Sequence, residues 1–121
     1  MARALTGPVV CFGEMLLRLA PPGARMMVQA QSLDMVVGGA EANVAAALAA
    51  LGQEARMVTL LPSSPLGDKA KADLGAAGVD TRFIARADGR MGLYFLEPGA
   101  GLRPSSITYD RAGSAFALAS P

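Results

Sequence analysis

Two adjacent glycines, Gly38 and Gly39, stand just before a polar side chain, Asn43, at the start of an alanine-rich stretch. Glycine lets a ligand approach the main chain closely, and free N–H groups at the start of a helix attract anionic or hydroxyl-rich ligands. Asn43 offers both a hydrogen-bond donor and an acceptor, as recognition of a sugar hydroxyl requires. The pattern predicts a ligand site at a helix start; a flexible turn before an ordinary helix explains the glycines equally well.

The elements around this pattern predict a doubly wound α/β sheet. Short apolar runs are typical of buried parallel strands, and apolar residues at helical spacing indicate the helices between them. The order strand, helix, strand, helix favours this fold class. We expect these four elements at residues 9–12, 41–51, 56–61 and 65–77.

Turn residues mark the ends of both expected helices. Gly52 follows the first helix as its C′ residue, and Ser64 and Pro65 supply the N-cap and first residue of the second. The apolar residues that recur at helical spacing are Val44, Leu48 and Leu51 in the first helix and, on the inner side of the second, Leu66, Ala70, Leu74 and Ala77.

The other segments indicate strands outside the parallel sheet. Residues 14–37 suggest edge strands or a flap, residues 81–85 suggest a strand, and residues 91–97 and 105–109 flank a turn like a hairpin. Such strands often form a lid over a ligand site. We therefore expect residues 1–121 to form a portion of one domain, with core elements at about 9–13 and 38–80 and lid strands at about 14–37 and 81–111. Two core strands leave a parallel sheet incomplete.

Composition excludes several classes of function. The net charge is +1 from 11 basic and 10 acidic residues that do not cluster, so nucleic acid is not an expected partner. No apolar run approaches the ~20 residues of a membrane span, and residues 1–8 lack a signal peptide, so we expect a cytoplasmic protein without membrane contact. Cys11 lies in an apolar run and is interpreted as a buried hydrophobe.

Four stretches of the sequence, in this order, resemble the ribokinase, or PfkB, family of carbohydrate kinases. Together, at family spacing, they form a specific pattern: residues 10–14 (VCFGE), 38–52, 65–68 (PLGD) and 78–81 (GVDT). Residues 92–97 and 109–115 are similar to the corresponding segments of 2-keto-3-deoxygluconate kinases in particular. The resemblance covers the chain from Val9 onward and implies the amino-terminal portion of a ribokinase-like α/β fold.

The resemblance implies that six residues contact an acid sugar: Gly38, Gly39, Asn43, Tyr94, Tyr109 and Arg111. The two tyrosines would line the pocket from the lid, and Arg111 would meet the substrate's carboxylate. The role of Arg111 also follows from its chemistry, because a planar guanidinium matches a carboxylate; the alternative is a solvated charge at the end of a strand. Arg18 is a weaker candidate for a second anion contact.

The sequence departs from the family pattern in two ways that concern function. Glu41 stands where many members have a small residue, and we interpret it as an acidic residue that favours the first turn of a helix rather than as a ligand contact. The Gly-Ala-Gly-Asp segment, which in the family supplies the base and holds the phosphates, has no counterpart here. We expect no catalytic residue and no metal ligand in this chain. ATP and Mg²⁺ would serve the parent enzyme and not bind this chain alone.

Three functions remain open. The first is a kinase that phosphorylates an acid sugar with ATP, in which this chain supplies sugar binding and lid and is inactive alone. The second is a non-catalytic module that binds a sugar acid or another anion. The third, compatible with the first, is an assembly fragment that forms a homodimer through apolar lid strands. The residues expected at that interface are Val36, Val37, Leu93, Phe95 and Ile107.

Overall fold

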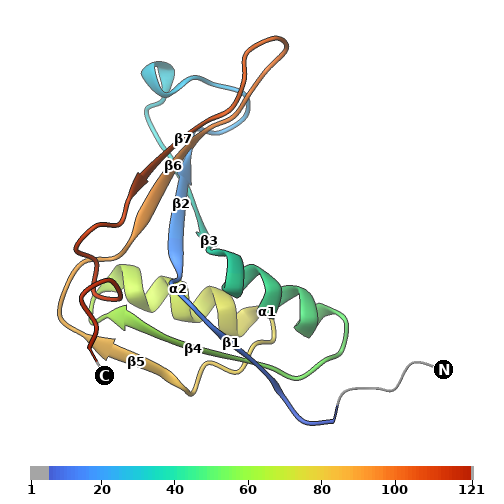
Figure 1. The fold of residues 1–121 in the computed structure, drawn as a ribbon. Helices are drawn as coiled ribbons and strands as arrows, with labels where there is room; N and C mark the ends of the chain where they lie inside the picture. Colours follow the sequence, from blue (N-terminus) through green and yellow to red (C-terminus); the bar gives the residue numbers. More distant parts are fainter. Residues whose placement is uncertain (1–5, 121) are drawn as a thin grey trace.

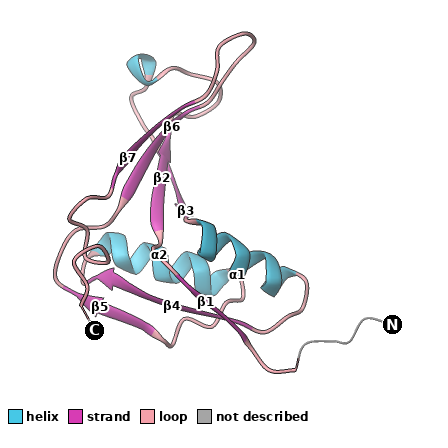
Figure 2. Cartoon of the chain, viewed as in Figure 1, coloured by secondary structure: helices cyan, strands magenta, loops and turns pink. Residues whose placement is uncertain are grey.

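The computed structural model describes residues 6–120, which form a core and a separate lid (Figures 1 and 2). The expectation for the first eight residues therefore lies mostly outside the described part. The core holds a parallel sheet of order β1-β4-β5, made of β1 (Val9–Phe12), β4 (Ala55–Pro62) and β5 (Ile84–Ala87), and two helices, α1 (Ala40–Ala50) and α2 (Pro65–Ala76). None of the described helices is long and apolar enough to span a membrane.

The core forms where the two helices cover one face of the parallel sheet. Alternate residues of β4 turn toward them, so that Met57 and Leu61 are fully buried. On α1 the buried side chains are the small Ala42 and Ala45, which bring the helix close to the sheet. Val44 and Leu51, two of the apolar residues that recur at helical spacing in the sequence, are instead 53% and 84% exposed. On α2, Ala70 and Leu74 are buried as predicted, but Leu66 and Ala77 are exposed.

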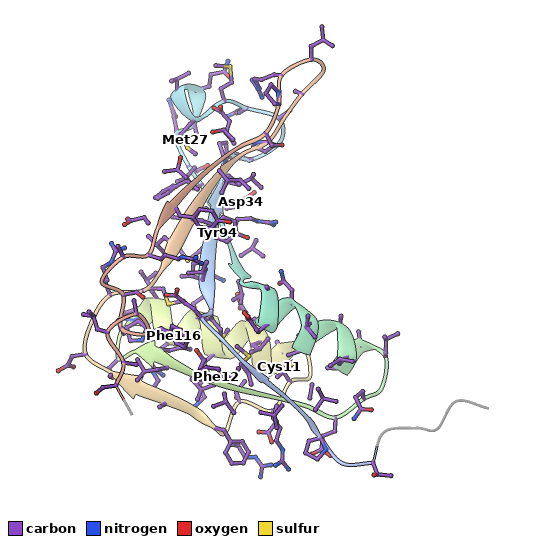
Figure 3. All side chains as sticks on the ribbon, viewed as in Figure 1. Cys11, Phe12, Met27, Asp34, Tyr94 and Phe116 are labelled. Carbon is purple, nitrogen blue, oxygen red and sulfur yellow. The ribbon has the colours of Figure 1, made fainter. Side chains whose placement is uncertain are left out.

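The second face of the parallel sheet is apolar and largely uncovered in the described residues. Val10 and Phe12 of β1 are 58% and 66% exposed, and Phe12 is paired in register with Val58 of β4. Cys11 points to the opposite side, where it is buried as predicted (Figure 3). Parallel sheets are usually covered on both faces, so this surface is unusual for a parallel sheet.

One strand was assigned wrongly from the sequence. Residues 81–85 were expected in the lid, but the strand there, β5, pairs in parallel with β4 and completes a three-stranded core sheet. Two contacts explain its place: Ile84 is buried in the core, and Arg86 donates two hydrogen bonds to the carbonyl of Pro62, at 3.1 and 3.0 Å, and pairs with Asp68. The lid therefore resumes only after β5.

The lid is a four-stranded sheet of order β3-β2-β6-β7 that stands away from the core (Figure 1). Its strands are β2 (Leu16–Ala20), β3 (Asp34–Gly38), β6 (Leu93–Glu97) and β7 (Ser106–Asp110), with a short 3-10 turn at Met27–Gln29. β6 and β7 form the predicted hairpin, and β2 pairs with β3 and with β6. Glu97 accepts a hydrogen bond from the amide of Met27 at 2.5 Å, which ties the β2–β3 connection to the hairpin.

Candidate functional site: a cavity between core and lid

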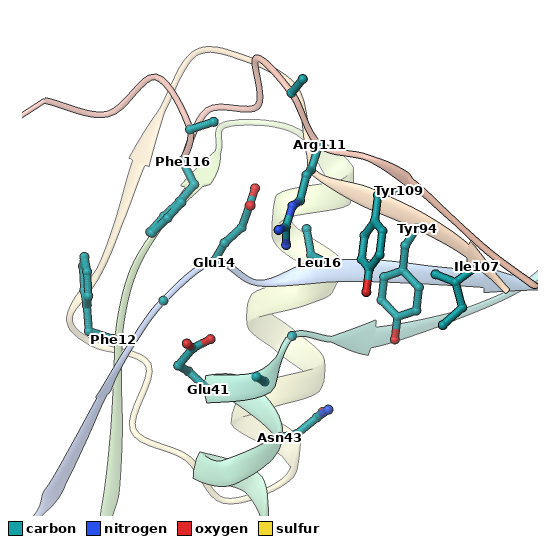
Figure 4. A pocket seen from close by; sticks show the side chains of 15 residues that line it. Phe12, Glu14, Leu16, Glu41, Asn43, Tyr94, Ile107, Tyr109, Arg111 and Phe116 are labelled. Atoms are coloured by element: carbon teal, nitrogen blue, oxygen red, sulfur yellow. The ribbon is translucent and has the colours of Figure 1, made fainter.

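An open cavity of about 1060 Å³ lies where the end of β1, the start of α1 and the lid hairpin meet (Figure 4). The described residues that line it come from all three places and from the segment after β7. They are Phe12, Gly13, Glu14, Leu16, Gly39, Ala40, Glu41, Asn43, Tyr94, Ile107, Tyr109, Arg111, Ala112, Phe116 and Ala117. Five of the six residues expected to contact sugar are among them; the sixth, Gly38, lies behind Tyr94.

Gly38 and Gly39, just before α1, lie so close to neighbouring atoms that neither position has room for a side chain. Gly39, the N-cap residue, has φ of 110°, and a Cβ placed there would lie 2.6 Å from the carbonyl oxygen of Glu14. A Cβ at Gly38 would lie 2.6 Å from the hydroxyl oxygen of Tyr94. A larger residue at Gly39 would push the connection between β1 and β2 away from the helix, whereas one at Gly38 would displace the Tyr94 side chain within the lid.

The lid contributes two aromatic rings and one cation. Tyr94 on β6 faces Tyr109 on β7 in the strand register, and their ring centres are 5.8 Å apart. The guanidinium of Arg111 lies 5.1 Å from the centre of the Tyr109 ring, a cation–π contact. Arg111 is exposed and makes no ion pair with a described residue, so its guanidinium can receive an anion from solution.

Two carboxylates of the cavity were missed from the sequence. Glu14 was noted only as the last residue of the VCFGE stretch, and Glu41 was interpreted as an acidic residue in the first turn of a helix, which it also is. Glu41 lies over Gly13, because a Cβ at that position would overlap its carboxylate. Glu14 accepts a hydrogen bond from the hydroxyl of Ser114 at 2.6 Å. Arg18, the weaker anion candidate, does not line the cavity.

The segment after β7 closes the side of the cavity next to β1. Phe116 packs against Phe12 with ring centres 5.9 Å apart, which Figures 3 and 4 show from two sides. At the base of the lid, Arg90 donates a hydrogen bond to Asp110 at 2.6 Å. This hydrogen bond and the opposite charges lower the pKa of Asp110 and raise the pKa of Arg90. The ion pair links the connection between β5 and β6 to the end of β7, the strand that carries Tyr109.

Residues 7–120 match the pfkB family of carbohydrate kinases. The match covers nearly the whole chain, and the chain therefore belongs to this family. Its parallel sheet, flanking helices and strand lid correspond to the ribokinase-like fold that was predicted.

Individual relatives are acid-sugar and hexose kinases. A 2-dehydro-3-deoxygalactonokinase from Haloferax volcanii is 39% identical over 117 residues, which are 97% of this chain and 37% of that protein. A 2-dehydro-3-deoxygluconokinase from Thermotoga maritima matches in structure with a TM-score of 0.91 and 53% identity, over 93% of this chain and 35% of that chain. A fructokinase from Xylella fastidiosa, solved with bound ATP, matches in structure with a TM-score of 0.76 and 31% identity, over 92% of this chain and 32% of that chain.

These comparisons confirm the resemblance to 2-keto-3-deoxygluconate kinases, since 2-dehydro-3-deoxygluconate is another name for the same sugar acid. This chain spans only about a third of the length of those relatives.

The charges that line the cavity do not suit a nucleoside triphosphate. Arg111 is the only basic residue among the described residues that line it, and the carboxylates of Glu14 and Glu41 would repel phosphate groups. In residues 6–120 no group of three or more histidine, cysteine, aspartate or glutamate side chains is placed to hold a metal ion. The polar groups that the cavity offers besides its two carboxylates are the guanidinium of Arg111, the amide of Asn43 and the hydroxyls of Tyr94 and Tyr109.

Proposed function

We propose that this chain supplies the sugar-binding site and lid of a kinase for a sugar acid such as 2-keto-3-deoxygluconate. The observation that carries the proposal is Arg111, whose guanidinium is stacked on Tyr109 at the cavity without an acidic partner among the described residues. Such a guanidinium presents two parallel N–H donors that match the two oxygens of a carboxylate. A neutral sugar has no carboxylate to receive them. The names of the Haloferax and Thermotoga relatives support the same substrate class.

Each side of the cavity would then bind one part of the substrate. Arg111 holds the carboxylate, while the rings of Tyr94 and Tyr109 pack against the carbon chain. Asn43 and the free N–H groups at the start of α1 bind hydroxyl or keto oxygens. In the complete kinase, ATP with Mg²⁺ would supply the phosphoryl group for a substrate hydroxyl. Because the described cavity residues offer no phosphate site, we expect this chain alone to bind substrate without turnover.

Titration calorimetry of the chain with 2-keto-3-deoxygluconate and with neutral fructose tests the proposal. We expect the sugar acid to bind at least about tenfold more tightly, a free-energy difference of about 1.4 kcal/mol. An assay of ADP release with ATP and the same sugar acid should give no product. Equal binding of both sugars, or binding of neither, would contradict the assignment of this cavity to a sugar acid.

We also propose that the chain forms a homodimer through its lid strands. The strand register places Val36 and Ile107 on the face that looks onto the cavity, where they are 42% and 52% exposed. Val37 and Leu93 are turned the other way and pack against the core, so they are not available to a partner. Sedimentation equilibrium should therefore report a dimer for the unsubstituted chain and a monomer for Ile107→Asp. A dimer in both would place the interface elsewhere.

A further inference from the structure

The chain passes between core and lid at four places, and Glu14 lies in the first of them. The crossings are residues 13–15 between β1 and β2, residue 39 between β3 and α1, residues 88–92 between β5 and β6, and residues 111–114 after β7. Figure 1 shows that these connections gather where the lid meets the core, and Figure 4 shows the carboxylate of Glu14 between β1 and the segment that carries Arg111.

Glu14 approaches each of the other three crossings closely. Its carbonyl oxygen lies 2.6 Å from the place that a Cβ on Gly39 would occupy. Its Oε2 atom lies 2.6 Å from the corresponding place on Gly92 and accepts the 2.6 Å hydrogen bond from Ser114. Gly39 and Gly92 thus leave room for Glu14, and Ser114 donates a hydrogen bond to its carboxylate.

The hydrogen bond with Ser114 reaches the proposed carboxylate-binding residue. Ser114 is 1% exposed, and its amide donates to the carbonyl of Arg111 at 3.2 Å, which closes the turn that carries this arginine. The Ser114 hydroxyl also accepts from the amide of Ala117 at 3.1 Å and so orders the segment beside Phe116. A short hydrogen bond from a hydroxyl to a carboxylate is stronger than one between neutral groups, especially where water is excluded.

We propose that Glu14 is a positioning residue: through Ser114 it fixes the orientation of the lid and the place of Arg111 over the start of α1. Without this contact, the turn at Arg111 keeps its backbone hydrogen bonds and the neighbouring ion pair between Arg90 and Asp110, but no side chain ties it to the connection between β1 and β2. The guanidinium then samples more positions before it meets a ligand. Ordering it then costs binding free energy. The sugar-binding part of this inference rests on the function proposed above, but the lid orientation does not.

The lid orientation can be measured without any ligand. Spin labels at Ala47→Cys on α1 and Thr108→Cys on β7, two exposed positions in regular elements, report the distance between core and lid in a Cys11→Ala background. We expect Ser114→Ala and Glu14→Ala to make the distance distribution about twice as wide. Glu14→Gln keeps an acceptor for Ser114 and should retain a narrow distribution. Asp73→Ala, which removes an ion pair within α2, is the matched control.

Binding supplies a second readout that a general loss of stability would not reproduce. With the far-ultraviolet circular dichroism unchanged, Ser114→Ala should weaken binding of 2-keto-3-deoxygluconate about tenfold, and Glu14→Gln should restore most of the loss seen in Glu14→Ala. Should Ser114→Ala fail to fold, the Glu14→Ala and Glu14→Gln pair decides the matter. Unchanged distance distributions in the folded variants would overturn the proposal. Wider distributions with no sugar binding in any chain would uphold it and contradict the proposed function instead.

Discussion

The rings of Tyr94 and Tyr109 lie side by side, with 5.8 Å between their centres and 38° between their planes. This arrangement follows from the β6–β7 register, in which the two residues are directly opposed, as cross-strand aromatic pairs favour. The hydroxyl of Tyr94 then lies close to Gly38 at the end of β3, and the guanidinium of Arg111 lies over the ring of Tyr109. The pair therefore joins the end of β3 to Arg111 along one side of the cavity.

Gly38→Ala should disturb this pair while leaving the chain folded. The added Cβ would lie 2.6 Å from the Tyr94 hydroxyl oxygen, and a side chain can move away where a backbone cannot. We expect about tenfold weaker binding of the sugar acid. The chain has two tyrosines and no tryptophan, so its tyrosine fluorescence reports this pair alone and should change in the variant. Unchanged fluorescence and affinity would show that Tyr94 does not depend on Gly38.

Gly39→Ala should reduce stability more than Gly52→Ala. Both glycines have positive φ, 110° and 86°, so both substitutions strain the backbone, at a cost of about 1–3 kcal/mol. At Gly39 the new Cβ would also lie 2.6 Å from the backbone carbonyl oxygen of Glu14, whereas the surroundings of Gly52 are open. Urea denaturation should give the lower midpoint for Gly39→Ala. Equal midpoints would mean that the core and lid can separate at this point without cost.

Ser64→Ala should weaken the start of α2. The Ser64 hydroxyl accepts a hydrogen bond from the amide of Gly67, at 3.4 Å, and loss of such an N-cap costs about 1 kcal/mol. Ser63→Ala is the control, because Ser63 contributes to the fold through its backbone amide, which donates to Ala87 at 2.8 Å. The free energy of unfolding from urea titrations should fall in the first variant and stay nearly unchanged in the second. An equal loss in both would contradict the capping role.

Asp80 should make the chain less stable in acid. Hydrogen bonds from the Arg82 side chain and amide, aided by the charges of Arg82 and Arg56, lower the pKa of Asp80 from its ordinary 3.8 to about 2. The unfolded chain therefore takes up the proton first as pH falls. The contribution of Asp80 to stability is complete above about pH 4 and is lost as pH falls to about 2.

This contribution can be isolated by substitution. Between about pH 4 and about pH 2, the urea midpoint of Asp80→Asn should fall less steeply than that of the unsubstituted chain. Asp88→Asn, which removes one negative charge from a side chain that forms no ion pair with a described residue, separates the ion pair from the change in net charge. Parallel curves for the Asp80 variant and the unsubstituted chain would show that its ion pairs do not persist in solution.

Local signals in the sequence predicted most of the core. The cap residues Ser64 and Pro65 placed the start of α2 correctly, and glycine at 52 placed the end of α1 within a residue. These signals work because a cap is decided by neighbours along the chain. The buried face of α1 was not predicted from the larger apolar residues. The small side chains Ala42 and Ala45 pack closely against the sheet, while Val44 and Leu51 are exposed.

Contacts between distant residues were not predictable. β5 joins the core because Arg86 reaches the carbonyl of Pro62, a residue 24 positions earlier, and nothing in the strand itself indicates that partner. The hydrogen bond between Glu14 and Ser114 spans 100 positions. The six candidate sugar-binding residues were found through the family resemblance, and the structure brings five of them to one cavity and places the sixth behind Tyr94.

The proposed function depends on binding of the substrate's carboxylate by Arg111, and a single set of titrations tests this contact. Binding of 2-keto-3-deoxygluconate and of fructose is measured by calorimetry for the unsubstituted chain, Arg111→Ala and Arg111→Lys. We expect Arg111→Ala to lose at least about tenfold in affinity for the sugar acid and nothing for fructose, with Arg111→Lys between, because lysine keeps the charge but not the planar pair of donors. Unchanged affinity for the sugar acid in Arg111→Ala would contradict the account.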